Sequence, residues 1–221
     1  MKLRHNFYLA GVLLLIVTGC AGFRGGWMSV AYIGAMPPEL GQDAEVDSEL
    51  RERPLRPVPG LELKISMDNQ LRTYDTQVYF ALPLGLDPRR VYPKNNRTGI
   101  TRVFVTATPE DVGFVFRASE AVLAIGEQRF AALAGYEFGL WGKDGERVKD
   151  GGTWDHRPVG KELALTEPGR SYYLSIDFAT PVPSPESEDI SLDLSRALVS
   201  DRHPPVPLIR FAPMRWKEGY T

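Results

Sequence analysis

Residues 61–68 read LELKISMD, and this stretch decides the fold class. Apolar residues occupy every second position from Leu61 to Met67, and polar residues stand between them. Successive side chains of a β-strand point to opposite faces of a sheet, so strict alternation predicts a strand with one buried and one wet face. Residues 172–179, YYLSIDFA, and residues 77–82, QVYFAL, alternate in the same way and are predicted to be strands.

Further short runs are typical of strands, and clusters of Gly, Pro, Asn and Asp separate them. The Asp144-Gly145 pair predicts a hairpin turn. With 21 glycines and 18 prolines, the pattern predicts an all-β fold, an antiparallel β-sandwich over residues 60–221. The additional strand-like runs are residues 101–106, 113–117, 121–125, 136–141, 163–165 and 207–211.

One segment, residues 184–199, is compatible with a helix or a strand. Ser184-Pro185-Glu186 resembles a helix start with proline in the first turn. Ile190 and Leu194 would share one face of that helix, but residues 189–194 also alternate as a strand. We favour the strand.

Residues 170–178 are similar to the tyrosine-bearing strand of immunoglobulin-like domains, in which a tyrosine near the strand start bonds back to the backbone. The resemblance favours an immunoglobulin-like or transthyretin-like sandwich. Cys20 is the only cysteine in the chain, so the disulfide of antibody domains is absent, and the likeness is to the wider architecture.

The N-terminus has the organisation of a bacterial export signal. Lys2, Arg4 and His5 precede a mainly apolar run at residues 7–17, which is too short to span a bilayer as a stable helix. Val17-Thr18-Gly19-Cys20 then resembles the lipobox of bacterial lipoproteins. The alternatives are an ordinary secretory signal and an uncleaved membrane helix.

The lipoprotein resemblance implies cleavage between Gly19 and Cys20, a diacylglycerol on the Cys20 thiol, and a further acyl chain such as palmitate on the new amino group. Two or more acyl chains anchor a protein firmly in a bilayer. Ala21 and Gly22 follow the cysteine where enteric inner-membrane lipoproteins carry Asp, which implies the outer membrane of the cell envelope, on the periplasmic side or at the cell exterior. Residues 1–19 are then the signal peptide, and the covalent lipid is the only cofactor expected.

Residues 20–59 are predicted to form the lipidated N-terminus. Residues 21–26 are glycine-rich and predicted to be a spacer, whereas the apolar residues 27–33 are a candidate first strand. Residues 39–59 are rich in charge and proline, which is typical of an exposed connector or of a long loop between strands.

The charge of the chain is mildly acidic. The formal net charge is −2, and removal of Lys2 and Arg4 with the signal makes it −4 (24 basic against 28 acidic residues). Nucleic-acid binding surfaces are usually strongly basic, so we expect no nucleic-acid partner.

The sequence carries no pattern typical of a hydrolase. Gly-x-Ser-x-Gly is absent, and the two histidines beyond the signal, His156 and His203, are interpreted as surface loop residues. Asp155 precedes His156, but adjacent residues of a strand point to opposite faces. We therefore expect no catalytic residues and no enzymatic activity.

Four acidic residues in the hairpin region are weak calcium candidates. Asp144, Glu146, Asp150 and Asp155 lie among glycines, and carboxylate oxygens are the ligands that calcium prefers. Their spacing does not match the EF-hand loop, so we interpret them as turn residues and predict no metal site.

Aromatic residues mark a candidate ligand or partner surface at Trp141, Trp154, Trp216 and Tyr220, with ordinary packing as the alternative. The tail at 211–221 would pack over the sandwich or project for recognition. The sequence favours a non-enzymatic, outer-membrane-anchored lipoprotein that binds an envelope protein or assembly. The alternative is a glycan- or peptidoglycan-binding module or an envelope hydrolase.

Overall fold

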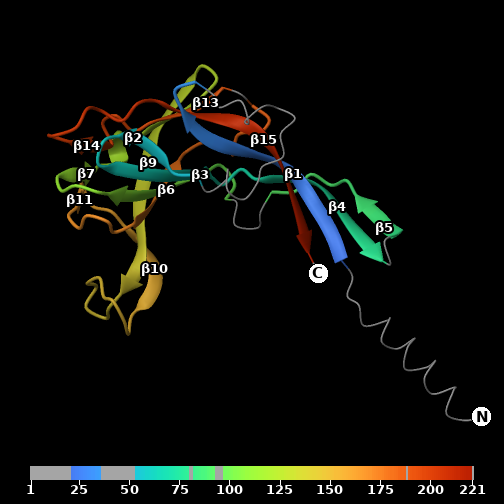
Figure 1. The fold of residues 1–221 in the computed structure, drawn as a ribbon, viewed down its shortest axis with the longest axis horizontal. Helices are drawn as coiled ribbons and strands as arrows, with labels where there is room; N and C mark the ends of the chain where they lie inside the picture. The colour runs from blue at the N-terminus through green and yellow to red at the C-terminus, as the bar shows by residue number, and fades with distance from the viewer. Residues whose placement is uncertain (1–20, 36–52, 80–81, 93–96, 188, 221) are drawn as a thin grey trace, which may run out of the picture.

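The computed structural model describes residues 21–35, 53–79, 82–92, 97–187 and 189–220 (Figure 1). The predicted signal segment, Gly19 and Cys20 lie outside the described residues, as does most of the stretch at 39–59.

The described chain is all-β. Its one helical element is the short 3-10 turn η2 (Ala118–Glu120). The strands are β1 (Ala21–Ile33), β2 (Leu55–Val58), β3 (Leu61–Met67), β4 (Leu71–Tyr79), β5 (Leu82–Asp87), β6 (Thr101–Pro109), β7 (Phe114–Phe116), β8 (Val122–Ile125), β9 (Gln128–Trp141), β10 (Thr153–Pro158), β11 (Leu163–Leu165), β12 (Tyr172–Phe178), β13 (Ile190–Asp193), β14 (Leu198–Ser200) and β15 (Ile209–Tyr220).

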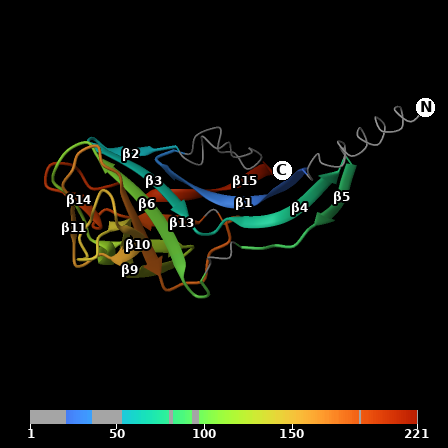
Figure 2. The same cartoon turned by 90° about the horizontal axis from the view of Figure 1, so that it is seen from below.

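Twelve strands form one curled antiparallel sheet in the order β2-β3-β6-β12-β9-β8-β13-β15-β1-β4-β5, with β10 paired to β9. The curled sheet forms two layers, one running from β2 to β12 and the other from β8 to β5. The long strand β9 joins them, because its residues 128–131 pair with β8 and its residues 132–138 pair with β12. The remaining strands form a small sheet in the order β11-β7-β14, at one end of the molecule (Figures 1 and 2). The result is a sandwich-like fold, as predicted.

The turn η2 packs closely against β9 at Gly135. A side chain at Gly135 would place its Cβ 2.1 Å from the Cβ of Ala118 in η2. Only glycine lets η2 pack directly on this strand.

The core lies between the layers and is built from the alternating positions predicted from sequence. Leu63 of β3 and Ile176 of β12 are fully buried, and Phe114 and Phe116 of β7 fill the same cluster from the small sheet. Burying side chains of this size is the main favourable contribution to folding.

Several predicted elements are confirmed. The alternating stretch at 61–67 is β3, and the favoured strand at 189–194 contains β13. The Asp144-Gly145 turn is present: the Gly142 N–H donates to the Glu146 carbonyl at 2.8 Å, and Gly145 has a φ of 89°. That positive φ is strained for other residues.

Other expectations are wrong. Residues 77–82 are not one strand, because β4 ends at Tyr79 and pairs there with Leu82, the first residue of β5. The helix that was the alternative for residues 184–199 does not form among the described residues of that range, which agrees with the favoured strand. The tail neither covers the sandwich nor stands alone, because residues 209–220 form β15 and pair with β1. Residues 21–26 are not a spacer but the first half of β1.

The tyrosine near the start of β12, Tyr172, bonds back to the backbone as the sequence predicts. The backbone N–H of Glu167, five residues upstream, donates a hydrogen bond to the Tyr172 hydroxyl oxygen at 3.1 Å. The Arg170 guanidinium lies 4.7 Å from the ring centroid. The bond fixes the turn that leads into β12.

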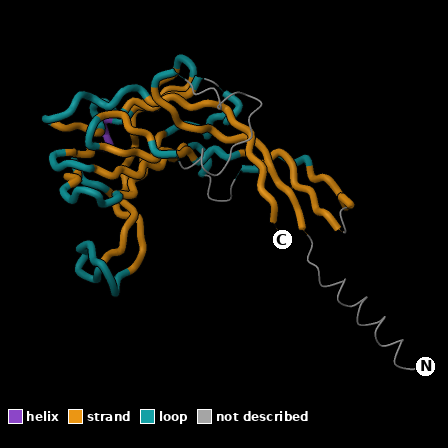
Figure 3. Tube along the Cα trace, viewed as in Figure 1, coloured by secondary structure: helices purple, strands orange, loops and turns teal. Residues whose placement is uncertain are grey.

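Strands β15, β1, β4 and β5 extend beyond the sandwich as an arm (Figures 1 and 3). We call this four-stranded extension the β1 arm. Its far end holds the start of β1, the end of β15 and the β4–β5 hairpin. Among the described residues, no helix is long and apolar enough to cross a membrane.

Candidate binding face

The outward side of one layer gathers aromatic side chains from four neighbouring strands, β6, β12, β9 and β10. Strand register pairs Phe138 of β9 with Tyr173 of β12 on one side and with His156 of β10 on the other. The next row pairs Ser175 of β12 with Phe104 of β6. Directly paired residues point to the same side of an antiparallel sheet. We call this side of β6, β12, β9 and β10 the aromatic face.

Phe138 touches two of its neighbours on this face, and most of the aromatic side chains remain open to solvent. The Trp154 ring is 60% exposed and stacks on Phe138 with centroids 5.3 Å apart. His156 lies 4.7 Å from the same ring. Phe104 and Tyr173 are exposed as well. Neighbouring exposed aromatics of this kind are typical of binding surfaces.

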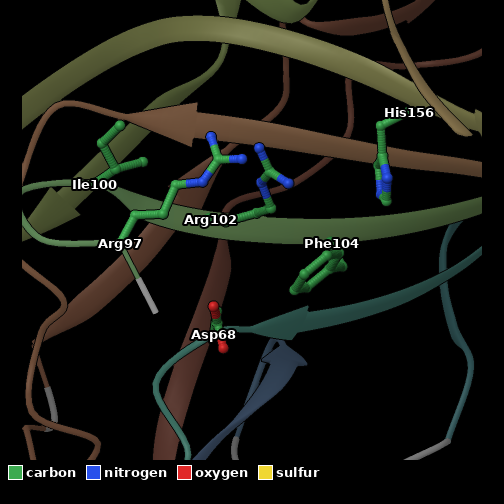
Figure 4. A pocket seen from close by; sticks show the side chains of 6 residues that line it. All are labelled: Asp68, Arg97, Ile100, Arg102, Phe104 and His156. Carbon is green, nitrogen blue, oxygen red and sulfur yellow. The ribbon is translucent and has the colours of Figure 1, made fainter. Parts of the chain in front are cut away.

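A cavity of about 480 Å³ opens at one side of the aromatic face (Figure 4). Arg102 and Phe104 come from β6, Asp68 follows β3, and His156 comes from β10. Its lining residues are Asp68, Arg97, Ile100, Arg102, Phe104 and His156. The site therefore combines two guanidinium groups, one carboxyl group, one imidazole and two apolar side chains.

Arg102 is held in place by Asp177, its directly paired neighbour on β12. Its Nε and Nη2 atoms lie 2.5 and 2.7 Å from the two carboxylate oxygens of Asp177. The Asp177 side chain is 3% exposed and that of Arg102 17%. The hydrogen bonds to Asp177 raise the pKa of Arg102, and its guanidinium also lies 5.1 Å from the Tyr136 ring centroid. A two-point ion pair orders Arg102 before any ligand arrives.

Burial also shifts the pKa values of His156 and Asp68. Burial lowers the pKa of His156 below 6.5, and the nearby Arg102 charge lowers it further. His156 is therefore neutral at neutral pH. Burial raises the pKa of Asp68, against an opposing effect of Arg102. Arg97 is exposed and forms no ion pair with the residues that the structure describes.

Of the four aromatic residues predicted to form a surface, only Trp154 lies on the aromatic face. Trp141 lies on the opposite side of the β9–β10 hairpin, where its indole N–H donates to the Asp155 carbonyl at 3.0 Å. Trp216 is buried beside Met214 in a small cluster of β1 and β15. The Tyr220 backbone ends β15, and its side chain lies outside what the structure describes.

The calcium candidates are not brought together. The carboxylate of Asp144 accepts from the Glu146 backbone N–H, that of Asp150 from the Gly151 N–H, and that of Asp155 from the His156 N–H. No group of three potential metal ligands forms in the part of the chain that the structure covers. Asp144 and Asp150 act in their own turns, whereas Asp155 lies in strand β10, so its interpretation as a turn residue was wrong.

Only one of the two histidines, His203, lies in a loop. His156 lies in strand β10, so its placement in a loop was wrong. His203 lies in a loop but is largely covered: its ring stacks on Phe114 at 5.0 Å, and its Nε2 lies 3.5 Å from Asp111. Within the described ranges, neither imidazole hydrogen-bonds to a hydroxyl group.

Sequence reasoning missed Phe104, Phe138, Arg97 and Arg102. A signal was present for two of them. Arg102 and Phe104 occupy the outward positions of the predicted strand at 101–106, where small polar residues are the norm for a solvated face. Comparison with protein-family models, with curated proteins and with solved structures finds no match for this chain.

Proposed function

We propose that this chain is a non-enzymatic, lipid-anchored protein of the bacterial outer membrane, and that its aromatic face binds an envelope protein. The observation that carries the binding role is the set of exposed aromatic side chains on neighbouring strands beside a pre-ordered arginine. Protein interfaces are enriched in Trp, Tyr, Phe and Arg, and a few such residues supply most of the binding energy.

The geometry supports a protein partner in two ways. Asp177 holds Arg102 rigid, so little side-chain entropy is lost when a partner contacts it. Arg97 is exposed at the cavity rim, where it can pair with a carboxylate of the partner. The Arg102–Asp177 pair and the exposed Arg97 together favour a partner that presents an acidic group next to apolar side chains.

The aromatic face is tested by site-specific crosslinking in cells. A photoreactive phenylalanine analogue at Tyr173 is expected to give one discrete adduct, which an Arg97→Glu background weakens. The same analogue at Leu208, which is exposed outside this face, is the matched control. Equal adducts at both positions, or none at Tyr173, would rule out this face as the partner surface.

The membrane anchor rests on the sequence Val17-Thr18-Gly19-Cys20 and is tested separately. Mass spectrometry of the mature N-terminus is expected to find acylated Cys20. Cys20→Ser should leave an unprocessed precursor or release the protein from membranes. A mature, membrane-bound Cys20→Ser protein of unchanged size would contradict the anchor.

A glycan or peptidoglycan ligand is the second candidate. The stacked pair Trp154–Phe138 is favourable for it, because sugar rings pack on exposed indoles while charged groups bind the hydroxyls. Isothermal titration with peptidoglycan fragments distinguishes the two: saturable binding that Trp154→Ala abolishes would favour the glycan over the protein partner.

A further inference from the structure

The end of the β1 arm has two chemically different faces. Strand register places Phe23, Thr76 and Leu86 in one row across β1, β4 and β5. The adjacent row contains Arg24 and Asp75 and points to the opposite side. We call the first side the apolar face of the arm and the second its charged face.

Ion pairs neutralise the charged face. Arg24 lies 2.9 Å from Glu218, and Arg72 lies 2.6 Å from Asp75 and 3.6 Å from Asp87. Arg89 adds a contact of 2.8 Å to Asp87, and these hydrogen bonds lower the pKa of Asp87 to about 2. Three arginines therefore oppose three carboxylates, and this face is satisfied by its own side chains.

The apolar face carries exposed apolar groups and uncompensated positive charge. Phe23 is 43% exposed and Leu86 64%. The Lys217 ammonium lies 5.5 Å from the Phe23 ring centroid, and farther along the strand the Arg215 guanidinium lies 5.1 Å from the Trp27 ring centroid. Neither cation forms an ion pair among the residues that the structure describes.

We propose that the end of this apolar face contacts the anionic headgroups of the membrane that holds the protein. The location rests on the proposed lipid anchor at Cys20. Aromatic rings and lysine side chains with apolar stems are favoured at the boundary between lipid and water. Each basic residue near an anionic leaflet adds electrostatic attraction, and the paired arginines of the charged face offer much less.

Chain geometry brings these side chains within reach of the bilayer. Strand β1 begins at Ala21, which pairs with Val78 of β4, so a lipid on Cys20 would be joined to the sheet without a flexible spacer. Phe23 lies three residues beyond Cys20, or about 10 Å along a strand. The headgroup region adds roughly 5–8 Å on each side of the hydrocarbon, so the start of β1 lies within it and the Phe23 side chain lies at its outer boundary.

The test uses the chain from residue 20 onward carrying Cys20→Ser, which keeps every contact described above and has no lipid. We expect it to sediment with vesicles of phosphatidylethanolamine and phosphatidylglycerol, more weakly with phosphatidylcholine vesicles, and less at high salt. Phe23→Ser and Lys217→Ala should each weaken partition about fivefold.

Arg24→Ala is the matched control, because it removes the same charge one residue from Phe23 but on the charged face. We expect it to change partition less than twofold. The proposal is overturned if Arg24→Ala weakens binding as much as Lys217→Ala, or if the parent chain does not bind anionic vesicles. Circular dichroism on each variant checks that the fold is kept. Because the probe is unacylated, its result is independent of whether Cys20 is lipidated in cells.

Discussion

Arg102→Met is the most informative single substitution on the aromatic face, because it leaves a carboxylate buried without its partner. The Asp177 side chain is 3% exposed and keeps two short contacts with the Arg102 guanidinium. Breaking a buried ion pair by removing one partner destabilises proteins by about 3–5 kcal/mol, whereas an exposed pair contributes about 1 kcal/mol or less. We expect the larger loss.

The two members of the Arg102–Asp177 pair differ in exposure, so we expect their substitutions to cost different amounts of stability. Arg102 is 17% exposed and can turn its guanidinium towards the cavity, so Asp177→Asn should cost less than Arg102→Met. The double variant Arg102→Met/Asp177→Leu removes both charges and should recover most of the stability, because apolar replacements of buried pairs are often neutral. It should still lose partner binding, since the ordered arginine is gone.

Unfolding in guanidinium chloride at pH 7 measures the free energy of unfolding of all three variants. A loss of 3–5 kcal/mol lowers the midpoint by about 1 M when the slope is unchanged. The reasoning is refuted if Arg102→Met costs under about 1 kcal/mol, or if the double variant is the least stable of the three. Either result would mean that water reaches Asp177 in solution.

Three further outcomes follow from the fold. Tyr172→Phe removes one backbone hydrogen bond and should cost about 1 kcal/mol in thermal unfolding, with binding unchanged. Gly26→Ala should prevent stable folding, because its Cβ would lie 1.9 Å from a backbone oxygen of β4. Gly34→Ala meets open space and should cost only about 1 kcal/mol, because Gly34 has a φ of 71°. Calorimetry on the two variants compares these losses of stability. The lowered pKa of His156 means that the unfolded chain binds the imidazole proton more tightly than the folded chain does. The contribution of His156 to stability is therefore full above pH 6.5 and falls as the pH drops from 6.5 to the folded pKa. NMR titration of His156 should give a midpoint below 6.5, and His156→Gln should remove this pH dependence of the stability.

The sequence was sufficient for the strands whose two faces differ in polarity. Residues 61–67 and 172–178 alternate because one side packs in the core and the other meets solvent, so period alone defines them. The same rule fails at residues 77–82, where alternation continues across the β4–β5 hairpin and hides the chain reversal. The glycines of residues 21–26 indicated a spacer, but Gly26 is required because β4 passes too close for a side chain.

The aromatic face could not be located in the same way, because it depends on register between strands far apart in sequence. Trp141 and Trp154 both flank the hairpin loop and were equally good candidates. Trp141 pairs with Thr153, which places Trp154 opposite Leu140 and on the other side of the sheet. A shift of one residue in this pairing would put both indoles on the same side. Local composition cannot fix that register, so which tryptophan lies on the aromatic face is decided by the turn geometry and by the packing of β9 on β12.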